Sequence, residues 1–444
     1  MKHLAVVGTG YVGLVSGAMF ASVGNRVTCV DKDPRVVEAL RAGKCTIHEP
    51  GLDEILRSAM AEGTLGFSTD TAEAVKTAEA VFIAVGTPSL ESGAYDFQYV
   101  EQCAHEIGRV LREHRKRCLV VLKSTVTPDI YARVHAIIDK VTRGSGSEFE
   151  LVSNPEFLAE GTAIRDFTQP HRVIVGVVSR DAQEFMEALY APFTKRKAGM
   201  LQVTDPRSAI VSKLAANSFL ACRVALINEL ARYCDVVGAD IESVRTGLAS
   251  DPRIGQLFLY AGPGYGGSCF GKDIRALRES AREHGTDVCL IPAIEESNNR
   301  HKLHLAKKIE QHFGSLEGKT IAVWGLAFKA RTDDVRESPA VDLIEYLLQH
   351  GARIQAHDPQ AAGRAQERFG ERIQQFENKY QAVCGAHALV IMTEWDAYKS
   401  PDFYELRERL ADRVIFDGRN ILECSEVEQA GLLYIGIGRP RSRA

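Results

Sequence analysis

Several common features are scarce or missing in this chain of 444 residues. The ten cysteines include no C-x-x-C pair and no spacing typical of a metal site, and several lie in apolar segments. We therefore expect reduced thiols, no bound metal and a cytoplasmic location. No uninterrupted apolar run reaches the roughly 18 residues that a membrane span needs, so no membrane partner is expected. The net charge is only −4, which provides no basic surface for a nucleic acid.

The composition is otherwise that of a soluble globular protein. Hydrophobic residues make up 45% of the chain and charged residues 25%. The chain is too long for a single hydrophobic core, so we predict two or three domains. An apolar stretch that begins at Leu4 imitates a secretory signal, but Gly8, Gly10 and Gly13 interrupt it. We therefore expect no signal peptide here.

These glycines form a dinucleotide-binding fingerprint. A short apolar run ends in Gly8-Thr9-Gly10-Tyr11-Val12-Gly13, and a helical pattern follows. Such glycines allow a tight turn and let the backbone approach a pyrophosphate at the helix N-terminus. Asp31 ends the next predicted strand, at 26–30, about twenty residues after the glycines. A carboxylate there accepts the ribose hydroxyls of NAD and repels the 2′-phosphate of NADP, so the sequence predicts NAD.

Further strands alternate with helical segments after Asp31, which predicts a parallel sheet with helices on both faces. Ligands of such sheets bind beyond the carboxyl ends of the strands. Thr87 and Thr125 stand at two of these ends, although each is equally suited to cap a helix. The predicted strands span 80–85, 118–122, 151–153 and 172–178.

A glycine-rich segment surrounds one cysteine, Cys269. Five glycines lie between Gly262 and Gly271, and Lys272 and Asp273 follow. The glycines permit close approach to a ligand, the lysine favours a thiolate, and the carboxylate can accept a proton. A small buried thiol in a structural turn is the alternative.

Two other segments carry candidate polar residues. Asn154 and Pro155 predict the start of a helix in which Glu156 and Glu160 lie one turn apart. Acidic residues also serve simply to stabilise a helix N-terminus, so this alternative stays open. A further helix, predicted at 206–234, is apolar almost all round and is expected to be buried between two domains. Lys213 and Asn217 lie on it four residues apart, and a buried ammonium requires an anionic partner or an active-site cavity.

A second α/β unit begins near residue 318, with predicted strands at 320–324, 353–356, 388–392 and 414–416. Its first turn lacks the glycine fingerprint and no acid is expected where Asp31 stands, so it should not hold a second NAD. Lys329, Arg336 and Arg419 lie at or just beyond strand ends, where they are placed to hold phosphates or to remain surface charges. We predict two Rossmann-like doubly wound parallel sheets of the α/β class joined by a long central helix. The predicted domains are 1–200, which binds NAD, 201–300, which carries the long helix and the cysteine loop, and 301–444, which forms the second Rossmann-like unit.

Six motifs in order carry a family resemblance: Gly-Thr-Gly-Tyr-Val-Gly, Asn-Pro-Glu-Phe-Leu-Ala-Glu-Gly-Thr-Ala, Lys-Leu-Ala-Ala-Asn-Ser-Phe, Gly-Tyr-Gly-Gly-Ser-Cys-Phe-Gly-Lys-Asp, Ala-Phe-Lys-Ala-Arg-Thr-Asp-Asp-Val-Arg-Glu-Ser-Pro and Phe-Asp-Gly-Arg-Asn. With them the chain resembles the nucleotide-sugar 6-dehydrogenases, the UDP-glucose/GDP-mannose dehydrogenase family. The resemblance implies a four-electron oxidation of UDP-glucose at C6, with two NAD consumed. It also implies that 201–300 carries the dimer contact and that 301–444 binds the nucleotide sugar. GDP-mannose and UDP-N-acetylmannosamine are the alternative substrates.

The resemblance also implies roles for individual residues. Cys269 is the implied nucleophile, and Lys213 with Asn217 stabilises the oxyanion. Asp273 accepts a proton through water, Glu156 acts in acid and base steps, and Thr125 positions water. Arg253 is implied to reach the partner's site in a homodimer. Further contacts to cofactor or substrate are implied for Tyr11, Val12, Thr87, Phe157, Leu158, Glu160, Tyr260, Gly262, Gly266, Lys329, Arg336 and Arg419.

Two other classes of function remain open on the sequence. One is a single-step hydroxyacid dehydrogenase, which also uses a buried lysine and asparagine but has no use for Cys269. The other is a catalytically silent NAD-binding or sensor protein. The joint presence of five candidate catalytic residues argues against it: Cys269, Lys213, Asn217, Asp273 and Glu156. A yield of two NADH per sugar would distinguish the four-electron oxidation from both of these classes.

Overall fold

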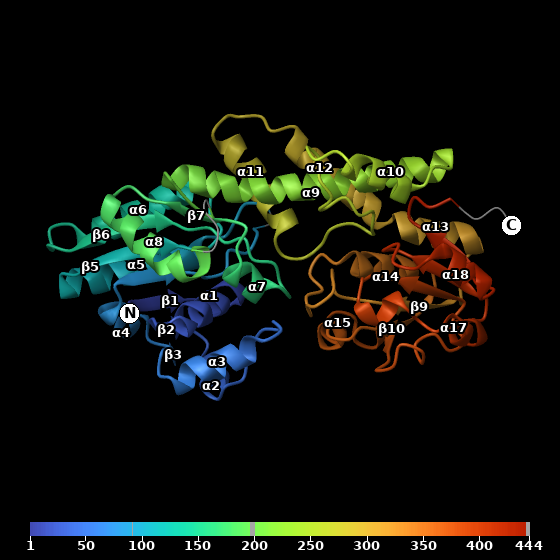
Figure 1. The fold of residues 1–444 in the computed structure, drawn as a ribbon, viewed down its shortest axis with the longest axis horizontal. Helices are drawn as coiled ribbons and strands as arrows, with labels where there is room; N and C mark the ends of the chain where they lie inside the picture. Colours follow the sequence, from blue (N-terminus) through green and yellow to red (C-terminus); the bar gives the residue numbers. More distant parts are fainter. Residues whose placement is uncertain (91, 196–199, 441–444) are drawn as a thin grey trace. The chain divides into compact units, whose positions relative to one another are not determined.

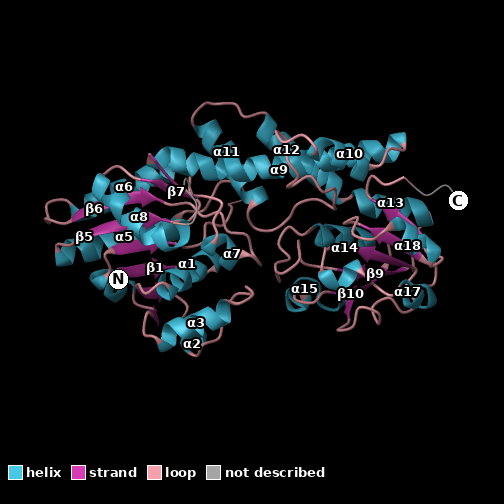
Figure 2. Ribbon diagram, viewed as in Figure 1, coloured by secondary structure: helices cyan, strands magenta, loops and turns pink. Residues whose placement is uncertain are grey.

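The computed structural model of the chain describes residues 1–90, 92–195 and 200–440. Its packing separates two compact units. The first comprises Met1–Ala216 and Arg275–Asp287, and the second comprises Asn217–Ile274 and Val288–Ala444. Figure 1 traces the elements from blue to red along the chain, and Figure 2 shows that each unit is a sheet with helices around it.

The sheet of the first unit has eight strands in the order β3-β2-β1-β4-β5-β6-β7-β8. Neighbours pair in parallel except β6 and β7, which pair antiparallel. The strand order reverses beside β1, which is where such sheets bind a nucleotide. The strands are β1 His3–Val7, β2 Arg26–Val30, β3 Leu65–Ser68, β4 Ala80–Ile83, β5 Arg117–Leu122, β6 Glu148–Ser153, β7 Val173–Gly176 and β8 Leu201–Thr204. The helices are α1 Tyr11–Ser22, α2 Pro34–Arg41, α3 Leu52–Ala61, α4 Thr71–Thr77, α5 Gln98–His114, α6 Pro128–Thr142, α7 Ala163–Thr168 and α8 Arg180–Thr194.

Successive residues of the central strands enter two different cores. Leu4 and Val6 belong to the cluster that includes α1, whereas Ala5 and Val7 belong to the cluster that includes α5 and α6. Side chains of a strand alternate between faces, so a strand covered on both faces must be apolar throughout. This explains the uninterrupted apolar runs from which the strands were predicted.

The second unit has a six-stranded parallel sheet in the order β11-β10-β9-β12-β13-β14. Its strands are β9 Thr320–Trp324, β10 Arg353–His357, β11 Gln374–Gln375, β12 Ala388–Ile391, β13 Val414–Asp417 and β14 Leu433–Gly436. Its helices are α10 Ile241–Ala249, α12 Leu290–Lys302, α13 His304–Phe313, α14 Pro339–Gln349, α15 Ala362–Phe369, η1 Gly370–Arg372, α16 Asp396–Lys399, α17 Phe403–Arg409 and α18 Cys424–Gln429. A further helix, α11 Phe270–Glu283, contributes its first turn to this unit and the rest to the other.

The long helix α9 spans Pro206–Val237 and supplies residues to both units. It begins where Asp205 accepts a hydrogen bond from the Ser208 N–H and ends at Gly238, whose φ is +75°. Among the described residues it is the one helix long and apolar enough to cross a membrane, but the core helix of a soluble protein passes the same test. The predicted class, two Rossmann-like parallel sheets joined by a long helix, is confirmed.

The expectation that α9 is buried all round is wrong. Phe219, Leu226 and Tyr233 expose 64%, 54% and 63% of their surface, and they recur every seven residues on one side of the helix. Composition alone cannot distinguish a helix that is buried by its own chain from one that leaves an apolar stripe for another molecule.

Candidate active site

The glycine turn after β1 forms an open cradle. The φ of Gly8 is +102°, and a Cβ on Gly8 would come within 2.7 Å of the Ala84 carbonyl oxygen. A Cβ on Gly13 would come within 1.9 Å of the Gly8 carbonyl oxygen, so only glycine closes this turn. Nothing lies within 4 Å of a Cβ on Gly10. The first and third glycines thus shape the turn, and the second leaves a space that a pyrophosphate fits.

Asp31 follows β2 directly and faces this turn. Its Oδ2 accepts hydrogen bonds from the Thr9 N–H at 3.1 Å and the Thr9 hydroxyl at 2.6 Å. Thr87 lies beyond β4 and is buried, and Thr125 lies beyond β5 and is half-buried. These residues belong to the carboxyl edge of the sheet, and their arrangement fits an NAD molecule whose ribose is held by Asp31.

A pair of alanine variants separates the two roles of the glycines. We expect Gly13→Ala to destabilise the fold by more than about 3 kcal/mol, because its methyl group overlaps a backbone oxygen. We expect Gly10→Ala to unfold at the wild-type temperature, since its φ of −66° suits alanine, yet to bind NAD roughly tenfold more weakly. Thermal unfolding and NAD titration measure both effects; equal NAD affinity in Gly10→Ala would contradict the cradle.

Tyr11 takes part in a contact that the sequence did not predict. Its hydroxyl contacts the buried carboxylate of Glu49, and the Gly161 N–H donates to both groups, at 2.6 Å to Tyr11 Oη and 2.7 Å to Glu49 Oε2. The first turn of α1 is thereby tied to the loop that follows Glu160. Nothing in the sequence around Glu49 indicates this role, because its partners lie far away in the chain.

A buried ion pair joins two of the predicted residues. The Nζ of Lys213 lies 3.0 Å from Oε1 of Glu156, and their side chains expose only 5% and 7% of their surface. The anionic partner that the sequence requires for Lys213 is therefore Glu156. Burial raises the pKa of Glu156, but the charge and hydrogen bond of Lys213 outweigh it, so the net shift is downward and Glu156 is a carboxylate.

Phe157 lies between two cations. Lys213 Nζ is 5.4 Å from the centre of its ring, and the Arg172 guanidinium carbon is 3.9 Å from it. The Leu158 N–H donates to Oε2 of Glu156 at 2.6 Å. Cation–π contacts and a hydrogen bond from its own backbone thus fix the segment around Glu156.

The predicted helix at 155–160 is wrong, because α7 begins only at Ala163. Asn154 cannot act as its cap, since its side chain points into the unit. Its Oδ1 accepts from Lys123 Nζ at 3.1 Å and from the Tyr190 hydroxyl at 2.5 Å, and its Nδ2 donates to the Ile174 carbonyl. Glu156 and Glu160 therefore do not share a helical face. The buried network outweighs the local capping preference.

Cys269 lies in the second unit and is exposed. Its carbonyl accepts the first hydrogen bond of α11, from the Asp273 N–H at 2.9 Å. The thiol therefore stands at the N-terminus of a 14-residue helix, where the amide dipoles stabilise a negative charge. This position suits a thiolate nucleophile.

Asp273 is buried one turn after Cys269. Its Oδ2 accepts from Nδ2 of Asn217 at 2.6 Å, and its Oδ1 lies 3.5 Å from Lys272 Nζ. The structure thus brings together Asn217, Lys272 and Asp273. A carboxylate fixed by an amide and an ammonium has a defined orientation, as a proton acceptor requires.

Three polar side chains form hydrogen bonds with the backbone of the glycine-rich segment, and the sequence analysis did not identify them. Asn228 of α9 accepts from the Gly262 N–H at 2.9 Å, and Nε2 of His301 lies 2.7 Å from the Gly262 carbonyl oxygen. Asn298 bonds both the N–H and the carbonyl of Tyr265. A polar Asn within the apolar face of α9 was the available signal for Asn228.

The protonation of His301 follows from its neighbours. Burial lowers its pKa to about 3, so the ring is neutral near pH 7. Arg232 donates to its Nδ1 at 3.0 Å, and the proton must then be on Nε2, which donates to Gly262. His301 is therefore a fixed donor that orients the loop.

Five of the predicted substrate residues line one pocket of the second unit. The pocket has a volume of about 310 Å³, and Asn228 and Phe270, which adjoins Cys269, also contribute to its wall. Aromatic rings and two cations at such a pocket suit a base and phosphates. The five predicted residues are Tyr260, Gly262, Gly266, Lys329 and Arg419.

Arg419 is oriented by the turn that follows β13. Its guanidinium donates to the Met392 carbonyl at 2.8 Å and the Phe328 carbonyl at 2.5 Å, and it lies 3.1 Å from Glu394. Its backbone N–H donates to Asp417 at 3.0 Å. Burial raises the pKa of Asp417 to about 6, with the backbone donors around it acting in the opposite direction.

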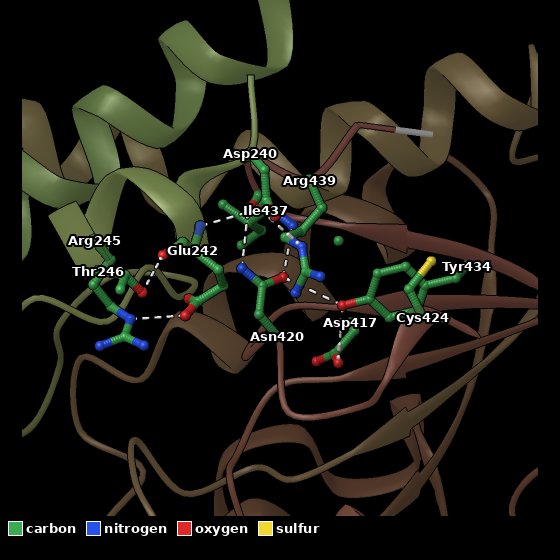
Figure 3. Close-up of polar contacts among 12 residues, drawn as sticks. Asp240, Glu242, Arg245, Thr246, Asp417, Asn420, Cys424, Tyr434, Ile437 and Arg439 are labelled. Atoms are coloured by element: carbon green, nitrogen blue, oxygen red, sulfur yellow. Dashed lines mark hydrogen bonds and ion pairs between the residues drawn. The ribbon is translucent and has the colours of Figure 1, made fainter. Parts of the chain in front are cut away.

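The same turn is braced by a network near the end of the chain (Figure 3). Asn420 bonds both the N–H and the carbonyl of Ile437, and the Tyr434 hydroxyl donates to Asp417. In the same view Arg245 pairs with Glu242 at 2.7 Å. The Arg245 guanidinium also stacks 4.6 Å from the centre of the Tyr260 ring, so the network reaches the pocket wall.

Arg336 and Arg253 are placed differently from the pocket residues. Arg336 pairs with Asp334 at 2.7 Å and is mostly exposed. Arg253 pairs with Asp251 at 2.6 Å and exposes 88% of its side chain. Neither lines the pocket.

The expectation that no acid stands in the second unit where Asp31 stands in the first is wrong. Asp358 follows β10 directly, as Asp31 follows β2. Its carboxylate is buried and accepts from the N–H groups of Leu326 at 2.7 Å and Ala327 at 3.1 Å. These amides belong to the turn after β9, so an internal carboxylate occupies the position that a bound anion would take.

Comparison with known proteins bears on the whole chain. It matches three family models: the NAD binding domain of the UDP-glucose/GDP-mannose dehydrogenase family over residues 2–194, its central domain over 207–300 and its UDP binding domain over 322–424.

Within the described residues, no group of three or more His, Cys, Asp or Glu side chains is placed to hold a metal ion.

Individual relatives match over nearly their full length. The UDP-glucose 6-dehydrogenase of Pseudomonas aeruginosa is 44% identical, over 99% of this chain and 98% of that protein. The UDP-glucose 6-dehydrogenase TuaD of Bacillus subtilis is 40% identical, over 100% and 94%. The solved UDP-glucose dehydrogenase of Pyrobaculum islandicum superposes with a TM-score of 0.91 at 35% identity, over 99% and 98%. The chain is therefore an NAD-dependent oxidoreductase and belongs to the UDP-glucose/GDP-mannose dehydrogenase family.

Proposed function

We propose that this protein oxidises the C6 alcohol of UDP-glucose to the carboxylate of UDP-glucuronate. The observation that carries the proposal is the exposed thiol of Cys269 at the N-terminus of α11, beside Phe270 in the wall of a pocket lined by Lys329 and Arg419. Full-length similarity to UDP-glucose 6-dehydrogenases of two bacteria supports UDP-glucose as the substrate.

The nucleotide end of the substrate is assigned to the second unit. Lys329 and Arg419 are cations suited to the diphosphate, and Tyr260 and Phe328 supply aromatic surface for the base. The cofactor is assigned to Gly8, Gly10, Gly13 and Asp31. NAD bound there supplies the hydride acceptor for each of the two oxidations.

The chain's own residues then carry the remaining chemistry. In the first oxidation Asp273 accepts the proton of the C6 hydroxyl through water, and the Lys213 ammonium, assisted by Asn217, stabilises the negative charge that develops on the C6 oxygen. In the second, the Cys269 thiolate adds to the aldehyde carbon, so that the resulting hemithioacetal has a C–H bond from which hydride can leave. Loss of that hydride and of the hydroxyl proton produces a thioester on Cys269.

Water then cleaves the thioester. Glu156, ionised in its pair with Lys213, accepts the proton of the attacking water, and Thr125 helps to position that water. The carbonyl carbon gains the water oxygen, the C–S bond breaks, and the Cys269 thiolate leaves. Asp273 takes part in proton transfer at Cys269 through water, in the orientation set by Asn217.

The test of this function is the yield of NADH with three nucleotide sugars, each followed to completion. We expect two NADH for each UDP-glucose and an acid product. One NADH per sugar with a free aldehyde would contradict the covalent second step. Turnover of UDP-N-acetylmannosamine or GDP-mannose without turnover of UDP-glucose would assign the alternative substrate within the same chemistry.

We also propose a homodimer in which the stripe of Phe219, Leu226 and Tyr233 is covered by a second copy of the chain. The two exposed rings and the exposed leucine, which recur every seven residues on α9, support this, because an apolar stripe of that length is costly in water. Arg253, exposed at the edge of the segment after α10, is proposed to complete the partner's substrate site. The lack of any disulfide among the described cysteines supports a cytoplasmic location. The functional division into 1–200, 201–300 and 301–444 is part of the same proposal.

Subunit mixing tests the role of Arg253. Arg253→Ala and Cys269→Ser homodimers are each expected to be nearly inactive. In a mixed dimer one site keeps both groups, so an equal mixture should recover about a quarter of wild-type activity if subunits exchange freely. No recovery, with exchange verified by differently tagged copies, would place Arg253 in its own subunit's site, and an active Arg253→Ala homodimer would place it outside the reaction.

A further inference from the structure

Lys123 is a buried cation to which the chemistry above gives no role. It follows β5 directly and exposes only 4% of its surface. Its Nζ donates to Oδ1 of Asn154 at 3.1 Å and to the Tyr190 hydroxyl at 3.2 Å, and both partners are neutral. An ammonium buried against two neutral groups is unfavourable unless a negative charge lies near.

The negative charge near Lys123 is Glu156. The chain runs from Asn154, which Lys123 bonds, to Glu156 two residues later. The charged groups that act on Lys123 are Glu156 and Lys213, from the loop after β6 and from α9. Tyr190 of α8 stays neutral, because burial raises the pKa of its phenol. One carboxylate is thus flanked by two cations inside the first unit.

The two cations act differently on Glu156. Lys213 contacts the carboxylate directly at 3.0 Å, whereas Lys123 bonds the side chain of Asn154, two residues before Glu156, and lowers the pKa of Glu156 by its charge. Burial lowers the pKa of Lys123 to about 8, with Glu156 acting to raise it and Lys213 to lower it. Glu156 therefore has a second cation near it besides Lys213, whose charge the proposed chemistry assigns to the C6 oxygen.

We propose that Lys123 is a positioning residue that keeps Glu156 ionised and in place as the acceptor of the water proton when the thioester is cleaved. This inference rests on the proposed function. It assigns the two lysines separate tasks: Lys213 faces the reacting oxygen and Lys123 supports the base. A direct contact of Lys123 with substrate is not part of the proposal.

The test compares Lys123→Met, Lys123→Arg and Tyr190→Phe. Methionine keeps the length of the side chain without its charge, arginine keeps the charge, and Tyr190→Phe removes one hydrogen bond while leaving the ammonium. The measurement is the rate of UDP-glucuronate formation from pH 5.5 to 9. We expect the acid limb of the Lys123→Met profile to move up by about one pH unit, which is roughly a tenfold loss of rate below the limb. We expect the limb to stay in Tyr190→Phe and to be largely restored in Lys123→Arg.

Two outcomes would overturn the proposal. One is a folded Lys123→Met enzyme with the wild-type acid limb. The other is an equal shift in Tyr190→Phe, which would identify packing rather than charge as the cause. If the wild type itself forms no UDP-glucuronate, the proposed function has failed, and the pH profile no longer applies.

The pH dependence of thermal stability tests the charge of Lys123 without requiring catalytic activity. The pKa of Lys123 is lowered to about 8 in the folded chain from 10.5, so its burial costs stability below pH 8 and that cost is relieved as pH rises from 8 through 10.5. We therefore expect the melting temperature of the wild type to rise relative to Lys123→Met over this range. An identical pH dependence of the two melting temperatures would show that Lys123 is not held as a buried ammonium.

Discussion

Cys269→Ser is expected to abolish formation of the acid product while UDP-glucose still binds with nearly wild-type affinity. A serine hydroxyl is far less nucleophilic at neutral pH than a thiolate at a helix N-terminus, so the aldehyde is not captured. We expect the rate of UDP-glucuronate formation to fall on the order of 10⁴-fold or more, as is usual when a covalent nucleophile is removed. The measurement combines product analysis with a binding titration.

The matched control is Cys384→Ser. Cys384 is also exposed, but it lies after β11 and outside the pocket. We expect this variant to keep the wild-type rate. Unchanged acid formation in Cys269→Ser would exclude the thioester route, whatever the substrate.

Lys213→Met is expected to impair both stability and catalysis. The substitution leaves the Glu156 carboxylate buried without its direct cation, which typically costs about 3–5 kcal/mol. The rate of the first oxidation should fall by about 10²–10³-fold, because a preorganised charge at the reacting oxygen is lost. Denaturant unfolding and single-turnover NADH formation measure the two effects.

The double variant Lys213→Met with Glu156→Gln separates them. Removing the carboxylate charge together with its partner should recover most of the lost stability, since a neutral pair needs no compensation. It should recover none of the rate. If the double variant is as unstable as the single one, the pair contributes by shape and not by charge.

The pH dependence of the pair has a defined sign. The pKa of Glu156 is lowered in the folded chain, so its contribution to stability is present above the unfolded pKa and is lost as pH falls through the folded value. The buried Asp417 has the opposite sign: its pKa is raised to about 6, so its contribution to stability is fully present below the unfolded pKa and is lost as pH rises through about 6. The turn that carries Arg419 therefore depends on the surrounding backbone donors to keep Asp417 in place.

Features that depend only on residues close together in the sequence could be predicted from the sequence. The glycine fingerprint, Asp31 and the strands β2 and β9 are local patterns in which turn chemistry and apolar alternation coincide. The order of such βα units was enough to predict two Rossmann-like sheets. The glycine-rich segment also identified Cys269 as a candidate without reference to any other part of the fold.

The tertiary structure decided what the polar residues contact. Asn154 looked like a helix cap, but Lys123 and Tyr190, 31 and 36 residues away, bind its side chain inside the unit. His301 and Gly262 are 39 residues apart, and their contact leaves no trace in either local segment.

Sequence patterns report a residue's preference for a local conformation, whereas a buried hydrogen bond or ion pair is worth more than that preference when its partners are brought from distant segments. For this chain, local sequence patterns alone therefore determined the class of fold, the cofactor turn and the candidate thiol. Only the packing of distant segments revealed that Glu156 pairs with Lys213, that Lys123 binds Asn154, and that Asp358 accepts from the turn after β9.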